Sequence, residues 1–238
     1  MNTSKNQISL ANVSKYLLVI LIPFLIVLIN FNYLSFNRTF FKKIQGQIQS
    51  NVSLDNRILY TNNVIDYYSN IKLLDVNFYS YQAQLHLAQV KDLLNATKII
   101  IALNIIVILL LITILVHEKR YEIIFTAMFY SGLICLSLFL LLGIGISKYF
   151  DFLFLNIHKL LFTDTLWLFP STDTLIQVFP NEFFVLFARQ FAINVMITSG
   201  ILAAVSFVTN IVIHRASHTS FPRQPKAGPP LAEKRESI

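Results

Sequence analysis

Charged residues are scarce in this chain. Of its 238 residues, 13% are charged and 55% are hydrophobic, whereas soluble globular domains contain about 25% charged residues. The deficit falls in a few long apolar runs, which indicates that lipid is the solvent. The net charge is +7, but the basic residues are spread over the chain ends and the loops. Because they form no basic stripe interleaved with aromatic residues, we expect no nucleic-acid partner.

Cysteine and the familiar catalytic motifs are also missing or rare. The single cysteine, Cys135, lies between Ile134 and Leu136 in an apolar run. It excludes a disulfide within the chain and a thiolate metal cluster, and its surroundings favour a small hydrophobic residue over a nucleophile. There is no Gly-x-Ser-x-Gly, His-Glu-x-x-His, Walker or calcium-loop pattern. We therefore expect neither a metal nor a cofactor.

Four apolar runs are present, each long enough to cross a membrane, since a spanning helix needs about 20 mostly apolar residues. No small-x-small cleavage site follows the first run, so we interpret that run as an uncleaved anchor. The predicted fold is an all-α integral membrane protein with four transmembrane helices and two helical extracytoplasmic loops. The predicted organisation is an N-terminal tail at 1–15, spans at 16–34, 97–116, 122–146 and 187–213, outer loops at 35–96 and 147–186, a turn at 117–121 and a tail at 214–238.

The two outer loops contain helical patterns of their own. The apolar residues of 58–68 recur on one side of a helix, and a pattern starting at Tyr81 continues into the second span without a breaker. The segment 148–162 is apolar and aromatic, which is typical of a helix at the membrane interface. Pro180 fits the first position of a helix that continues into the fourth span. Trp167 lies where an aromatic belt is expected.

The basic residues predict the orientation. The N-terminal tail, the turn 117–121 and the C-terminal tail share one side and are basic on balance, so the positive-inside rule puts both termini in the cytoplasm. The outer loop 147–186 is acidic on balance, as this orientation requires, whereas the longer loop 35–96 is slightly basic. From residue 214 the chain has four prolines and no apolar periodicity, which predicts a disordered tail.

His86 and His158 are the strongest candidates for chemistry. They lie in different outer loops, and each has apolar neighbours at helical spacing, such as Val90 for His86 and Phe154 and Phe162 for His158. Near the membrane an imidazole titrates close to neutral pH, as a general acid or base should. The alternative is that each is a buried or interfacial histidine satisfied by one hydrogen bond.

Metal chemistry at the two histidines is less well supported. Two axial histidines of a haem normally come from the spanning helices, and these two come from loops. Zinc would need further ligands. Asp92 and Asp164 are available, but no ligand spacing recurs in the sequence.

The second loop carries a specific pattern. It consists of His158-Lys159-Leu160-Leu161-Phe162, Trp167-Leu168-Phe169-Pro170, Asp173-Thr174-Leu175-Ile176 and Phe179-Pro180-Asn181-Glu182-Phe183-Phe184. This pattern resembles that of the bacterial lipoprotein intramolecular transacylases (Lit) and their uncharacterised integral-membrane relatives. In the first loop, His86-Leu87 followed by Val90-Lys91 is also similar to that family. The resemblance covers nearly the whole chain except the C-terminal tail.

The resemblance implies an enzyme of the bacterial cytoplasmic membrane that acts on the N-terminal lipopeptide of lipoproteins. Such enzymes move the sn-2 acyl chain of the S-diacylglyceryl cysteine to the α-amine of that cysteine and leave a lyso-form lipoprotein. The catalytic histidines would be His86 and His158, one as base and the other as acid. We expect Gln89, Phe162 and Trp167 to contact the substrate, with membrane lipids as the surroundings.

One position departs from the family pattern. The family usually has an acidic residue three positions after its first histidine, where the side chain can orient the imidazole, whereas this chain has Gln89. An amide can still accept a hydrogen bond but supplies no charge.

The competing function is a non-catalytic membrane scaffold or partner-binding protein of the same fold. A transporter is disfavoured because polar residues are scarce in the spans. The oligomeric state is not predicted.

Overall fold

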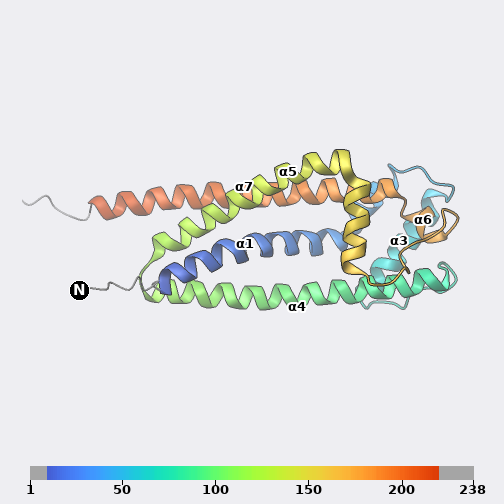
Figure 1. Ribbon diagram of the computed structural model, residues 1–238, viewed down its shortest axis with the longest axis horizontal. Coiled ribbons are helices and arrows are strands. Elements are labelled where there is room, and N and C mark those ends of the chain that lie inside the picture. Colours follow the sequence, from blue (N-terminus) through green and yellow to red (C-terminus); the bar gives the residue numbers. More distant parts are fainter. Residues whose placement is uncertain (1–9, 220–238) are drawn as a thin grey trace, which may run out of the picture.

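The computed structural model describes residues 10–219, and every regular element in that range is a helix. The helices are α1 Leu10–Ser35, α2 Arg38–Gln45, α3 Leu54–Tyr68, α4 Tyr81–His117, α5 Tyr121–Leu161, α6 Thr174–Val178 and α7 Asn181–Thr219. Four of them, α1, α4, the first part of α5 and α7, are long and apolar enough to cross a membrane. These four lie along the long axis of the molecule, and α3 and α6 cover one end (Figure 1).

Buried apolar side chains form two separate groups. One lies between the four long helices and includes Leu18, Ile22, Ile108, Leu115, Ile124, Cys135 and Val195. The other lies beneath the short helices at the loop end and includes Phe41, Ile44, Val64, Leu87, Val178 and Phe183. We call α2, α3, α6 and the adjoining ends of α4 and α7, which surround this second group, the cap. Because it buries its own apolar core, the cap can hold side chains in fixed positions beyond the bilayer.

Small residues allow α5 and α7 to approach closely. A Cβ atom added at Gly132 would lie 2.7 Å from the carbonyl oxygen of Ser199 and 2.9 Å from the backbone nitrogen of Ala203. Transmembrane helices associate through such close backbone contacts, since lipid offers no hydrophobic driving force between them. Two buried polar contacts add to the bundle: Asn104 donates to the Leu21 carbonyl at 3.2 Å, and Ser131 donates to the Leu18 carbonyl at 3.3 Å.

A bend in α5 turns the chain across the bundle. Tyr149 has non-helical backbone angles (φ −129°, ψ 27°), and it follows Gly143 and Gly145, where helix propensity is low. Beyond the bend, the last part of α5 crosses from the α7 side towards α4 (Figure 1). Asn181, the first residue of α7, donates to Asp151 at 2.8 Å and ties this part to α7. We call residues 150–161 the crossing helix.

Buried polar contacts join the elements of the cap to one another. Gln45, at the end of α2, donates to the hydroxyl of Thr61 at 2.9 Å and to the carbonyl of Val178 at 3.0 Å. Buried Arg57 donates to the carbonyl of Gln45 at 2.8 Å. These bonds join α2, α3 and α6, three elements that are distant in the sequence. Since buried polar groups are costly to leave unpaired, they favour one arrangement of the cap.

The predicted all-α membrane fold is confirmed. The four helices contain the four predicted spans, the pattern from Tyr81 does run unbroken into the second span, and the segment after residue 148 is a helix distinct from the span before it. Two details differ. α7 begins at Asn181, one residue after Pro180, whose carbonyl accepts from the Phe183 amide at 2.9 Å. α7 also continues to Thr219, so an irregular tail does not begin at residue 214; residues 1–9 and 220–238 lie outside the described range.

Candidate active site

His86 lies on the buried side of α4, close to its first residue. Ser80 caps the helix by accepting from the Ala83 amide at 3.2 Å. With 37 residues, α4 is about 55 Å long and exceeds the hydrocarbon thickness of about 30 Å, so its first turns extend beyond the bilayer. His86 is in these turns, ahead of the apolar run, and only 8% of it is exposed.

His158 lies on the crossing helix, one turn from its end. Its Nδ1 atom is 2.8 Å from the carbonyl oxygen of Phe154. Because a carbonyl can only accept, a neutral His158 must carry its proton on Nδ1, and Nε2 is then free to accept a proton. The bend at Tyr149 directs the crossing helix towards α4, and His158 lies on that helix.

The two imidazoles converge. Their ring centroids are 6.3 Å apart with planes inclined by 31°, which is too far for a direct hydrogen bond between the rings. Phe162 lies against both, with centroids 4.9 Å from His86 and 5.7 Å from His158. Trp167 lies 5.2 Å from His158, and Phe169 lies 5.8 Å from His86. The histidines thus share one aromatic enclosure, although they come from different loops.

Polar contacts fix the loop that closes this enclosure. Gln82 on α4 donates to the carbonyls of Leu166 at 3.1 Å and Leu168 at 2.8 Å. The Trp167 indole donates to the Asp164 carbonyl at 3.0 Å. These bonds hold residues 162–169 against the first turns of α4. The aromatic side chains beside both imidazoles are therefore positioned by the backbone.

Gln89 connects the two loops. It lies one turn after His86 on α4, and its Nε2 atom donates to the carboxylate of Asp164 at 2.5 Å. Two nearby buried atoms, His86 Nδ1 and Gln89 Oε1, have no hydrogen-bond partner. The Gln89 amide is thus in contact with a carboxylate from the other loop.

Burial shifts both imidazoles towards the neutral form. It lowers the pKa of His158 from its ordinary value of 6.5, and the hydrogen bond to Phe154 opposes this shift. Burial also lowers the pKa of His86; the Gln89 side chain and the Asp164 charge oppose the shift, while His158 adds to it. Near pH 7 both rings can therefore accept a proton.

The predicted site residues fall in one place. His86, His158, Gln89, Phe162 and Trp167 all belong to this cluster, and sequence reasoning missed only its neighbours. In the sequence, Asp164 stands out only as a possible zinc ligand, and nothing marks Phe169 as a site residue. Within residues 10–219, no three histidine, cysteine or acidic side chains are grouped to hold a metal ion.

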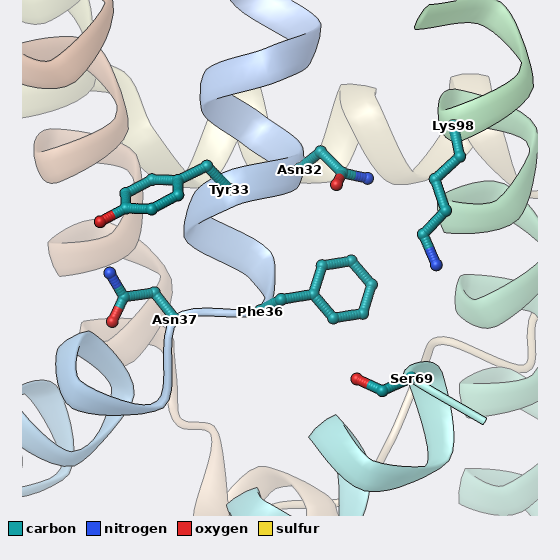
Figure 2. A pocket seen from close by; sticks show the side chains of 6 residues that line it. All are labelled: Asn32, Tyr33, Phe36, Asn37, Ser69 and Lys98. Carbon is teal, nitrogen blue, oxygen red and sulfur yellow. The ribbon is translucent and has the colours of Figure 1, made fainter. Parts of the chain in front are cut away.

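Two hollows lie elsewhere on the molecule. One of about 440 Å³ is open between α1, α3 and α4 and is lined by Asn32, Tyr33, Phe36, Asn37, Ser69 and Lys98. Figure 2 shows Lys98 reaching down from α4 towards Phe36, whose ring centroid is 4.6 Å from the ammonium nitrogen. The other, of about 450 Å³, lies between the loop after α2 and the α6 region. Neither shares a lining residue with the histidine cluster.

The fold and the cluster define a polytopic membrane protein with a histidine pair in an aromatic enclosure near the membrane surface. Residues 3–184 match the family model of the lipoprotein intramolecular transacylase Lit. The chain belongs to this family of membrane acyltransferases. A comparison with curated proteins finds no match.

Solved structures of a similar fold are those of the membrane-integral lipoprotein intramolecular transacylase Lit from Bacillus cereus. One matches with a TM-score of 0.69 and 16% identity, covering 88% of this chain and 98% of the other. A second, with a histidine-to-arginine mutation, has a TM-score of 0.66, 17% identity and coverage of 87% and 94%. A third, with a histidine-to-alanine mutation, has a TM-score of 0.67, 16% identity and coverage of 88% and 96%.

Proposed function

We propose that this protein moves the sn-2 acyl chain of an S-diacylglyceryl cysteine to the α-amine of the same cysteine. The single observation that carries the proposal is the convergence of His86 and His158, 6.3 Å apart between ring centroids, in a chain of the transacylase family. The product is an N-acylated lyso-form lipoprotein. The substrate is the lipid-modified N-terminus of a bacterial lipoprotein.

The reaction needs no enzyme nucleophile, because the substrate amine attacks. A bond forms between the α-nitrogen and the ester carbonyl carbon, and the bond from that carbon to the sn-2 oxygen breaks. The proton lost by the nitrogen balances the one gained by the glycerol oxygen. Holding amine and ester in contact supplies most of the acceleration, since effective molarities of well-oriented groups reach about 10⁵–10⁸ M.

His86 acts as the base and His158 as the acid. The α-amine has a pKa of about 8 and must lose a proton on attack, which a neutral imidazole can accept. The charge of Asp164 favours the protonated form of His86 that results. His158 first takes a proton on Nε2, the nitrogen opposite its bond to Phe154, from the α-ammonium group of the substrate, and then gives that proton to the departing glycerol oxygen. One group between the rings can lie within reach of both.

The surrounding side chains hold the lipid. Phe162 and Trp167 form the wall next to the reacting ester. The outer side of the crossing helix exposes apolar residues, among them Phe152 and Leu160, 67% and 82% exposed. Such a face is suited to the membrane interface, where the acyl chains of the substrate remain in lipid.

We also propose that the cap lies outside the bacterial cytoplasmic membrane, with both termini in the cytoplasm. The start of α1, the turn between α4 and α5 and the end of α7 lie at the same end of the molecule (Figure 1). The turn and the C-terminal tail are basic on balance, which favours the cytoplasmic side. The diacylglyceryl cysteine is then met at the outer leaflet.

The test is expression in a bacterium whose lipoproteins carry a free-amine diacylglyceryl cysteine, followed by mass spectrometry of the N-terminal lipopeptide. The wild type should move one acyl chain from glycerol to nitrogen at unchanged total mass. His158→Ala should abolish the transfer, while His117→Ala, at the exposed turn far from the cluster, should retain it. An inserted wild-type protein that leaves the lipopeptide unchanged would overturn the proposal in favour of a scaffold of the same fold.

A further inference from the structure

Two buried polar atoms without a partner lie together on α4. They are His86 Nδ1 and Gln89 Oε1, whose residues are three positions apart and thus on one side of the helix. An imidazole nitrogen can donate, and an amide oxygen can only accept. The two atoms are therefore complementary, and one hydrogen bond from Nδ1 to Oε1 would satisfy both.

Asp164 fixes which way the Gln89 amide faces. A carboxylate only accepts, so the amide must turn its NH₂ group to Asp164, as the contact between Nε2 and the carboxylate requires. The amide oxygen is then left for His86. Because that oxygen only accepts, an imidazole paired with it carries its proton on Nδ1, and its Nε2 is then free to take a proton from the substrate.

The carboxylate is itself held by the loop. One oxygen of Asp164 accepts from Gln89, and the other accepts from the Leu166 amide at 3.0 Å. The backbone carbonyl of Asp164 accepts from the Trp167 indole, whose ring lies beside His158. A single turn of chain thus supports the surroundings of both histidines.

We propose that Asp164 is a positioning residue that acts on His86 through the amide of Gln89, setting the tautomer of the imidazole and stabilising its protonated form during the reaction. The inference rests on the proposed function. It adds how a carboxylate can act on His86 although position 89 is an amide. Gln89 transmits orientation but no proton, since its amide does not titrate. The titratable groups that act on His86 are Asp164 from the loop and His158 from the crossing helix.

Three variants remove, add or relocate the negative charge. Asp164→Asn keeps an acceptor for the Gln89 amide but removes the carboxylate. It should lower kcat about 10- to 100-fold with little change in KM. Gln89→Glu sets two carboxylates against each other and should also lower kcat. The double variant Gln89→Glu/Asp164→Asn carries one carboxylate, now next to His86, and should recover most of the wild-type kcat. Rescue by exchange is not expected if both residues are merely structural.

A second readout does not depend on activity. Nitrogen-15 NMR of the wild type, with His86 assigned by its loss in His86→Gln, should show the tautomer protonated on Nδ1. The titration midpoint of His86 should fall in Asp164→Asn, because a charge that raises its pKa is removed, and it should rise again in the double variant.

Opposite outcomes overturn the inference. An unchanged kcat and His86 midpoint in Asp164→Asn would exclude a role for this carboxylate, and a double variant as slow as Asp164→Asn would show that its charge is not what matters. If the wild type itself transfers no acyl chain, the proposed function fails, while the NMR measurement still decides the arrangement of Asp164, Gln89 and His86.

Discussion

The imidazole of His86 on α4 lies 6.3 Å, centroid to centroid, from that of His158 on the crossing helix. The two residues reach this distance because α4 extends beyond the apolar run and because α5 bends at Tyr149. At this distance the two imidazoles do not hydrogen-bond to each other. The proposed function places the reacting amine and ester where both imidazoles can reach them, because an intramolecular acyl shift depends on holding the two groups together.

The titration of His158 follows from its burial. Burial lowers its pKa below the ordinary 6.5, so the neutral ring persists at a lower pH than that of free histidine, and protonation occurs only as the pH falls further. Nitrogen-15 NMR of the protein in lipid, with His158 assigned by His158→Gln, measures the midpoint. A midpoint at or above 6.5 would contradict the described environment.

Phe162 should matter more than an exposed phenylalanine of the same segment. Its ring contacts both imidazoles, so Phe162→Ala removes their shared wall and should lower kcat about tenfold or more by loosening the reacting geometry. Phe152→Ala is the matched control on the outer side of the crossing helix. Initial rates on a diacylglyceryl lipopeptide compare the two, and equal losses would mean that only lipid contact is being measured.

Gly132 should be required for the packing of α5 on α7. In Gly132→Ala the added methyl group meets the backbone at Ser199 and Ala203 at 2.7 and 2.9 Å, and overpacking of this kind costs about 1–3 kcal/mol. The control is Gly200→Ala, where a Cβ meets nothing within 4 Å. Thermal unfolding in detergent should show a lower Tm for the first variant alone; an unchanged Tm would show that the helices are further apart.

The long elements were predictable because each depends on a local property. Apolar runs mark the spans, and the lack of a breaker between Tyr81 and the second span predicts a continuous α4. The eight residues of α2 and five of α6 are too short for a periodic signal, and they are held by tertiary contacts such as those of Gln45. The boundary at Pro180 was wrong by one residue, within the usual uncertainty of helix ends.

The site was predictable only in part. His86 and His158 stood out as ionisable residues among apolar neighbours, but their distance depends on the direction of the crossing helix after Tyr149. Nothing in the sequence links Gln89 to Asp164, which are 75 positions apart. Their contact arises when the loop after His158 is fixed on α4 by Gln82.

The most direct test of the paired histidines is a double-variant measurement with purified protein in lipid and a synthetic diacylglyceryl lipopeptide. Single-turnover rates would be compared for the wild type, His86→Gln, His158→Gln and the double variant. If the two act on one transition state, each single variant should lose at least about 100-fold, and the double variant should be little slower than the slower single one. A single variant that keeps the wild-type rate would contradict the pairing.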